Sequence, residues 1–239
     1  MRNIISDRRF LWSGLLLLPS LLALAIASWA CVRFSIPAPV LTRDMTALTN
    51  VPLYVSCISN LGLLYWCAAS AISAFSALLV QNTERMGARH FFIASALLSF
   101  ILLLDDMFMF HEALFPLYLG IPEKTIFIWY ILMTGLYLIL FRRIIVASGH
   151  ALILGTALTL FTLSALIDQI LEKELGTLVG HWLFMIEDGF KLLGLSLWLA
   201  FYVLISHELI TNGYSKAQSV MTSAQHRRPS VRRRAHSKP

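Results

Sequence analysis

Charged residues are scarce in this chain. Asp, Glu, Lys and Arg make up 13% of its 239 residues, whereas soluble domains have about 25%. Hydrophobic residues make up 58%, and the mean hydropathy is +0.73. This composition excludes an ordinary soluble protein and leaves no room for a second, soluble domain. The chain is therefore predicted to be an integral membrane protein.

Several familiar motifs are also missing. Cys31, Cys57 and Cys67 form no CxxC or Cys/His pattern and lie in or beside apolar runs, so we expect them to be packing residues. The sequence has no HExxH or HxxxH motif and no internal repeat. Function must therefore be inferred from individual polar residues and their positions.

Long apolar runs are abundant instead. Six of them are long enough to cross a bilayer, because a helical span needs about 20 residues. They cover about 10–32, 53–80, 91–115, 125–146, 150–171 and 179–207. The first run is longer than the apolar region of a signal peptide, so we expect it to be retained. The prediction is an all-α polytopic membrane protein, a six-transmembrane-helix bundle within residues 1–208.

The basic residues are unevenly distributed across this topology. With a cytoplasmic N-terminus, 14 of the 19 Lys and Arg residues face the cytoplasm. The positive-inside rule therefore predicts that both termini are cytoplasmic, as in a bacterial inner (plasma) membrane protein. Residues 209–239 are basic and lack an apolar pattern, which indicates a disordered cytoplasmic tail that can contact anionic headgroups. No aromatic residues interleave its arginines, so nucleic acid is not an expected partner.

Ionisable residues within the apolar runs are the most informative feature. A charge at bilayer depth costs roughly 2.5 to 3.5 kcal/mol, so such residues are expected to pair or to serve a function. In the predicted topology they gather in the outer halves of the spans, in two layers. The shallow layer contains His111, Glu112, Asp168, Glu172 and His181; the deep layer contains Asn60, Asp105, Asp106, Glu187, Asp188 and Lys191.

Helical spacing predicts how these residues face one another. Asp105 and Glu112 are seven positions apart, which places them on one stripe of a continuous helix. Asp106 lies about 100° around the helix from Asp105, so this helix does not aim both carboxylates at one point. Lys191 lies one turn after two acids of its own span and could form an ion pair within that helix.

Two histidines and several carboxylates are ligand types that suit zinc, iron or manganese. Such a metal can activate a bound water molecule. The predicted metal ligands are Asp105, His111, His181 and Asp188. The predicted catalytic residues are Asp106 or Glu187 as general base, together with Lys191; Asn60, Glu112 and Asp168 complete the polar site. The ligand types are similar to those of the alkaline-ceramidase and progestin-receptor superfamily of intramembrane zinc hydrolases. This chain lacks that superfamily's paired histidines in a final helix and has one span fewer.

Three functional classes agree with this pattern. The first is an outward-facing hydrolase or transferase, assisted by a divalent metal such as zinc, that acts on a lipid or lipid-linked substrate. The second is a transporter coupled to protons or cations, and the third is a non-enzymatic subunit of a membrane assembly. A transporter needs a path to the inner side, where the spans hold no acids, so the one-sided site favours the enzyme. The reaction, the substrate and the oligomeric state do not follow from the sequence.

Overall fold

The protein is described by a computed structural model that covers residues 21–42, 49, 51–52, 54–80, 86–171 and 182–226. The regular elements in these residues are all helices, which confirms the predicted all-α class. The chain divides into two units, Met1–Ser56 and Cys57–Pro239. In the first unit, the structure describes a helix at Leu21–Phe34 and the short α2 (Ala38–Thr42).

The second unit contains five long apolar helices. They are α4 (Cys57–Leu79), α5 (Met86–Phe108), α6 (Glu123–Ala147), α7 (Ala151–Leu166) and α9 (Trp182–His226). Each is long and apolar enough to cross a membrane, α7 together with the start of the segment that follows it. The chain is thus a helical membrane protein. Of the six predicted spans, the first begins outside the described residues, and its described part, Leu21–Phe34, is a shorter apolar helix.

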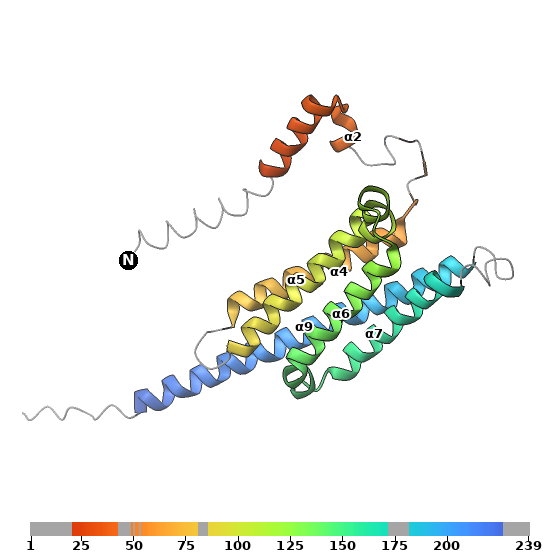
Figure 1. The fold of residues 1–239 in the computed structure, drawn as a ribbon. Helices are drawn as coiled ribbons and strands as arrows, with labels where there is room; N and C mark the ends of the chain where they lie inside the picture. The colour runs from red at the N-terminus through yellow and green to blue at the C-terminus, as the bar shows by residue number, and fades with distance from the viewer. Residues whose placement is uncertain are drawn as a thin grey trace, which may run out of the picture. The chain divides into compact units, whose positions relative to one another are not determined.

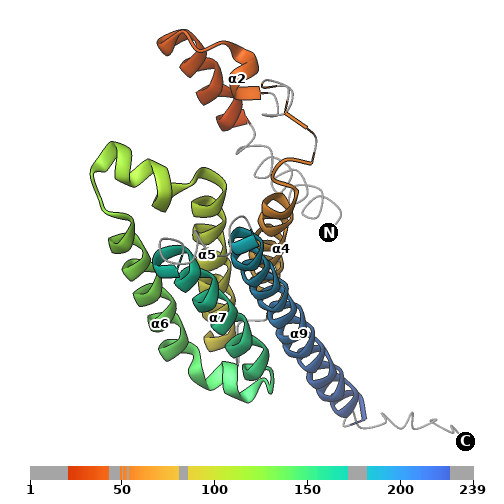
Figure 2. The same ribbon diagram turned by 90° about the vertical axis from the view of Figure 1, so that its right-hand side faces the viewer.

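The five long helices pack side by side with alternating direction (Figures 1 and 2). α4 lies against both α5 and α9, and α7 lies against α9. Because successive helices alternate in direction, α5 ends where α4, α6 and α9 begin. We call this the polar end of the bundle, since the ionisable residues described below lie there.

The third predicted span differs from the structure. We expected one continuous helix over 91–115, but α5 ends at Phe108 and Met109 adopts a left-handed backbone conformation with φ 51°. The chain then continues as a π-helix, η1 (Phe110–Leu119). The predicted stripe through Asp105 and Glu112 is therefore wrong, because the break changes the direction of every later side chain.

The other two spans that carry acids also end differently from the prediction. α7 changes at Leu166 into a short π-helix, η2 (Ile167–Leu171). α9 continues to His226, past the expected end at 207. Residues 227–239 lie outside the described part of the chain.

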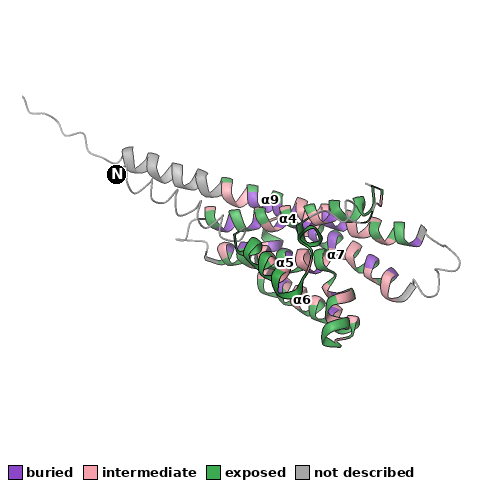
Figure 3. Ribbon diagram, turned by 90° about the horizontal axis from the view of Figure 1, so that it is seen from above, coloured by how far each residue is buried: buried purple, intermediate pink, exposed green. Residues whose placement is uncertain are grey.

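The interior of the bundle is packed with aromatic rings and small residues. The rings of Trp66, Phe161 and Trp198 lie with centroids 5.6 to 6.0 Å apart and join α4, α7 and α9. Gly194 lets α7 and α9 approach closely, since a Cβ atom there would lie 2.9 Å from the Phe161 ring. By contrast, α6 has only Ile126, Tyr137 and Ile145 buried, and most of its surface is exposed (Figure 3).

Neutral hydrogen bonds cross this interior. The Tyr137 hydroxyl on α6 lies 2.8 Å from Ser95 Oγ on α5 and 3.1 Å from the Tyr202 hydroxyl on α9. Trp198 Nε1 donates to Ser99 Oγ at 3.0 Å. We call Ser95, Ser99, Tyr137, Trp198 and Tyr202 the hydroxyl network. It links three helices without any charged group.

Candidate functional site

Charged side chains from separate helices meet at the polar end. α5 supplies two consecutive aspartates, Asp105 and Asp106, η1 supplies His111, and α9 supplies Lys191. The two aspartates are about 100° apart on the helix, and the structure confirms that they serve different partners. Asp105 contacts His111, and Asp106 contacts Lys191.

Asp105 is the centre of a buried hydrogen-bonded group. Its Oδ2 accepts from His111 Nδ1 at 2.6 Å, and its Oδ1 accepts from the His111 backbone N–H at 3.0 Å. The Tyr130 hydroxyl on α6 donates to the same Oδ1 at 2.7 Å. Asp105 and His111 are only 5% and 9% exposed. Three donors on one buried carboxylate hold the imidazole in a single orientation, with Nε2 directed away from Asp105.

The backbone break at Met109 makes this contact possible. On a continuous helix, residues six positions apart lie on different faces and do not meet. The left-handed Met109 and the π-helical turn bring His111 back over the end of α5. Left-handed non-glycine residues and π-helical turns are uncommon and often occur at functional sites. The local irregularity coincides with the contact between Asp105 and His111.

His111 and Glu112 lie beyond the span that ends at Phe108. Burial lowers the pKa of His111, but its hydrogen bonds to Asp105 and Glu112 and their negative charges outweigh burial and raise the pKa to about 10. The hydrogen bond with His111 lowers the pKa of Glu112, although burial opposes this, and the charge of Lys191 adds to the lowering. His111 is therefore an imidazolium at neutral pH, and its Nε2 lies 3.4 Å from Glu112 Oε1.

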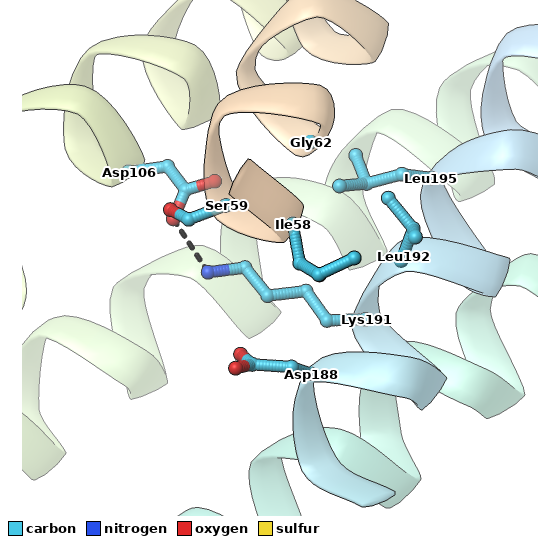
Figure 4. A pocket seen from close by; sticks show the side chains of 8 residues that line it. All are labelled: Ile58, Ser59, Gly62, Asp106, Asp188, Lys191, Leu192 and Leu195. Carbon is cyan, nitrogen blue, oxygen red and sulfur yellow. Dashed lines mark hydrogen bonds and ion pairs between the residues drawn. The ribbon is translucent and has the colours of Figure 1, made fainter. Parts of the chain in front are cut away.

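Asp106 and Lys191 form the second charged group. Lys191 Nζ donates to Asp106 Oδ1 at 2.5 Å, which joins α9 to α5. Lys191 therefore pairs with another helix instead of with the acids of its own helix that the spacing suggested. Asp188 lies on the other side of Lys191, one turn earlier on α9 (Figure 4).

A small pocket opens beside this pair. Its polar side consists of Ser59, Asp106, Asp188 and Lys191. Its apolar side consists of Ile58, Gly62, Leu192 and Leu195. The free volume is about 20 Å³, which is room for about one ordered water molecule. The pocket thus accepts a small polar group next to an apolar surface.

Other predicted residues lie apart from these two groups. Asp168 belongs to a third contact, in which Gln169 Nε2 donates to Asp168 at 2.9 Å and to Glu123 on α6 at 2.6 Å. Asn60 is exposed on α4 and is not among the residues that line the pocket, and Glu187 is half-buried on α9. His181 and Glu172 lie outside the described residues.

The predicted metal ligands are divided between the two groups. Asp105 and His111 are in contact, whereas Asp188 lines the pocket beside Lys191. Within the described ranges, no three His, Cys, Asp or Glu residues are arranged to hold a metal ion. His181, the fourth predicted ligand, is not described, so the full ligand set stays a prediction.

Sequence reasoning missed two residues of the site. Tyr130 falls among aromatic residues that are ordinary at a membrane interface, and nothing in its spacing ties it to Asp105, which is 25 positions away. Ser59 is a single hydroxyl at the start of a span. Its position near the start of a helix, next to Asn60, was the only sequence feature that pointed to a role for Ser59 in the site.

The fold and the polar end define a polytopic α-helical membrane protein with an ion-paired site at one end of its bundle. A family model described as "Domain of unknown function (DUF8692)" matches residues 15–205, and the chain belongs to this family. No curated protein and no solved structure matches the chain significantly.

Proposed function

We propose that this protein is a membrane enzyme, a hydrolase or transferase that acts on a lipid or lipid-linked substrate by acid–base chemistry. The observation that carries the proposal is the pair of consecutive aspartates, each of which orients one proton-bearing side chain. Asp105 orients the imidazole of His111, and Asp106 orients the ammonium of Lys191. Two oriented proton donors at the same end of the bundle suit the transfer of a group between oxygens.

His111 acts as the general acid in this proposal. Its Nδ1–H is held by Asp105, so Nε2–H is the proton that it can give away. In hydrolysis, a water oxygen attacks the acyl or phosphoryl centre and the bond to the leaving oxygen breaks. The leaving oxygen takes the Nε2 proton, and a carboxylate accepts the proton of the attacking water. Asp106 or Glu187 serves as that base. It then releases the proton to solvent, and solvent returns a proton to His111.

A divalent metal, with zinc as the candidate, is the alternative to acid catalysis by His111, because an imidazole that binds a metal through Nε2 has no proton there. A carboxylate on Nδ1 is the usual way in which proteins orient a histidine whose Nε2 binds a metal. Elemental analysis of the purified protein tests this alternative. We expect bound zinc in the wild type and less in His111→Ala and His181→Ala, and a metal-free preparation with full activity would contradict it.

The proposed location follows from the sequence. The excess of Lys and Arg on one side supports a bacterial inner (plasma) membrane with both termini cytoplasmic, and in that orientation the polar end faces outward. A substrate would then enter from the outer leaflet beside η1. Cysteine substitutions at exposed Tyr118 and Val146, labelled from outside with a membrane-impermeant maleimide, test the orientation. Labelling of the Val146 position alone would reverse it.

Comparative lipid analysis tests the enzymatic function. Whole-lipid extracts from cells that express the wild type are compared by mass spectrometry with extracts from cells that express His111→Gln. We expect one lipid class to fall and a related product to rise only with the wild type. Glu208→Gln, at a half-buried acid of α9 that lies 3.4 Å from His150 Nε2 and away from the polar end, is the matched control and should behave as the wild type. Identical lipid profiles for wild type and His111→Gln would contradict the proposal.

A proton-coupled carrier is the second candidate, and the hydroxyl network is the observation that favours it. Ser95, Tyr137 and Tyr202 give the bundle interior a chain of hydrogen-bonding groups, which a proton path away from the polar end would need. For this candidate, we expect pH-dependent flux in proteoliposomes that Asp105→Asn and Asp188→Asn abolish. Absence of flux with the wild type would argue against a carrier.

A further inference from the structure

The pocket beside Lys191 has one charged wall and one apolar wall (Figure 4). Asp106 and Asp188 flank the Lys191 ammonium on the charged wall. Leu192 and Leu195 of the same helix form the apolar wall, with Ile58 opposite them on α4. A ligand that matches both walls has a polar group joined directly to an apolar body, as a membrane lipid has.

The charges of the pocket favour a cationic group. Two aspartates share a single lysine, so the fully ionised pocket has an excess of one negative charge. Lys191 is bonded to Asp106, whereas Asp188 has no hydrogen-bond donor among the described residues. A second ammonium group that donates to Asp188 would balance the charge. Charge-assisted hydrogen bonds of this kind are the stronger ones in proteins.

Hydrogen-bond donors distinguish between the possible cationic groups. The pocket has room for about one ordered water molecule beside Asp188. A primary ammonium can take that place and has three N–H donors. A trimethylammonium group has no N–H donor. Gly62 also limits the space, since even a Cβ atom there would lie 3.1 Å from Leu195 Cδ1.

We propose that this pocket binds the primary ammonium group of an ethanolamine-type lipid headgroup. Asp188 accepts from the ammonium, and Lys191 lies where it can attract the phosphate to which the ammonium is linked. Ile58, Leu192 and Leu195 cover the adjoining apolar part of the lipid. Where it names the substrate class of the enzyme, this inference rests on the proposed function; as a binding site, it stands on the pocket alone.

Competition between lipids that differ only in the headgroup tests the inference. The full-length purified protein is mixed with equal amounts of dioleoyl phosphatidylethanolamine, phosphatidylcholine and phosphatidylglycerol, and bound lipid is measured by native mass spectrometry. We expect phosphatidylethanolamine to be preferred over each of the others by about tenfold, which corresponds to about 1.4 kcal/mol. Equal binding of the ethanolamine and choline lipids by the wild type would overturn the inference.

Variants of the pocket sharpen the test. Asp188→Asn removes the acceptor charge, and we expect the preference to fall below about twofold, whereas Asp188→Glu should retain most of it. Gly62→Ala narrows the pocket without a change of charge and should also weaken ethanolamine-lipid binding. Glu208→Gln removes an acid outside the pocket and should keep the wild-type preference. An unchanged preference in Asp188→Asn would show that the selectivity arises elsewhere.

A soluble competitor separates a lipid from a free amine. If ethanolamine phosphate displaces bound lipid only at much higher concentration than the lipid itself, the apolar wall contributes and the lipid assignment stands. If it competes equally well, the ligand is a soluble amine and the lipid assignment fails.

Binding and turnover can fail independently. His111→Gln should keep the headgroup preference and lose turnover, because His111 does not line the pocket. Selective binding of the ethanolamine lipid without any change in cellular lipids would support this inference and contradict the proposed enzymatic function. Turnover of a lipid that lacks an amine, without headgroup preference, would support the proposed enzyme and contradict the ethanolamine-lipid site.

Discussion

The polar end and the interior of the bundle satisfy their polar groups in opposite ways. At the polar end, ionisable groups pair across elements, and some remain open to the surroundings: Lys191 is 36% and Glu112 is 51% exposed in its side chain. In the interior, neutral hydroxyls bond to one another, and Ser95 and Tyr202 are fully buried. Neutral groups cost less to bury than charges and hold helices together. Charged groups near the surface can exchange protons, so we assign chemistry to one region and cohesion to the other.

The largest expected effect is on activity at the polar end. His111→Gln removes the proposed proton donor, and general acid catalysis contributes typically 10²- to 10⁴-fold, so we expect a loss of that order in turnover. The measurement is the rate of lipid conversion by purified protein. Tyr137→Phe, in the hydroxyl network, should keep its rate within about twofold. Equal losses of rate in both variants would contradict the assignment of catalysis to the polar end alone.

The pH dependence of stability should arise at the polar end and not in the interior. The pKa of folded His111, about 10, lies above the ordinary value of 6.5, so the folded state binds this proton more tightly. The resulting stabilisation is complete below about pH 6.5 and is lost as the pH rises towards 10. Thermal unfolding of the purified protein between pH 6 and 10 measures it. We expect a fall in Tm for the wild type and a flatter profile for His111→Gln.

Breaking one charged pair should cost more than removing both partners. Lys191→Met leaves the mostly buried Asp106 without its donor, and we expect a loss of about 1 to 3 kcal/mol in unfolding free energy. The lower part of this range applies if solvent around Lys191 screens the pair. In the double variant Lys191→Met/Asp106→Asn, much of the loss should be recovered. Additive losses in chemical denaturation would contradict a direct pairing.

Packing should dominate the interior. Gly194→Ala places a Cβ atom 2.9 Å from the Phe161 ring, and overpacking of this kind typically costs about 1 to 3 kcal/mol. Gly155→Ala on α7 is the matched control, because no atom lies within 4 Å of the added group. We expect thermal unfolding to show a clear loss for the first variant and a change of less than about 1 kcal/mol for the second.

The smallest expected effect comes from a single neutral hydrogen bond. Tyr137→Phe removes the hydroxyl that joins Ser95 and Tyr202. Interhelical hydrogen bonds in membranes average about 0.6 kcal/mol, so we expect a loss of that size. A loss of several kcal/mol would mean that the hydroxyl network does more than hold the helices together.

Much of the fold could be predicted because apolar length is a strong signal. Five of the predicted spans coincide with long helices, and the alternating direction of those helices is enough to bring Asp105, Asp106 and Lys191 to one end. The bounds were less predictable. Nothing in the residues around Met109 marks the break at which α5 gives way to η1, and the apolar pattern of α9 does not show that the helix continues to His226.

Contacts within the site were harder to predict than its position. Spacing on an ideal helix placed Asp105 and Glu112 on one face. This prediction was wrong because the left-handed residue Met109 changes the direction of the side chains that follow it. Tyr130 and Ser59 join the site through contacts between helices that are distant in sequence. A local pattern contains no information about such contacts.

The sequence by itself determined that this protein spans a membrane as helices and that the ionisable residues within its spans collect at one end. Apolar length and the cost of burying charge are properties of segments, so they can be read without a structure. Only the tertiary structure decided that Asp105 holds His111 and Tyr130, and that Asp106 holds Lys191 beside a pocket. Which donor meets which acceptor depends on the backbone break at Met109 and on the packing of α5 against its neighbours, and both arise only when the chain folds.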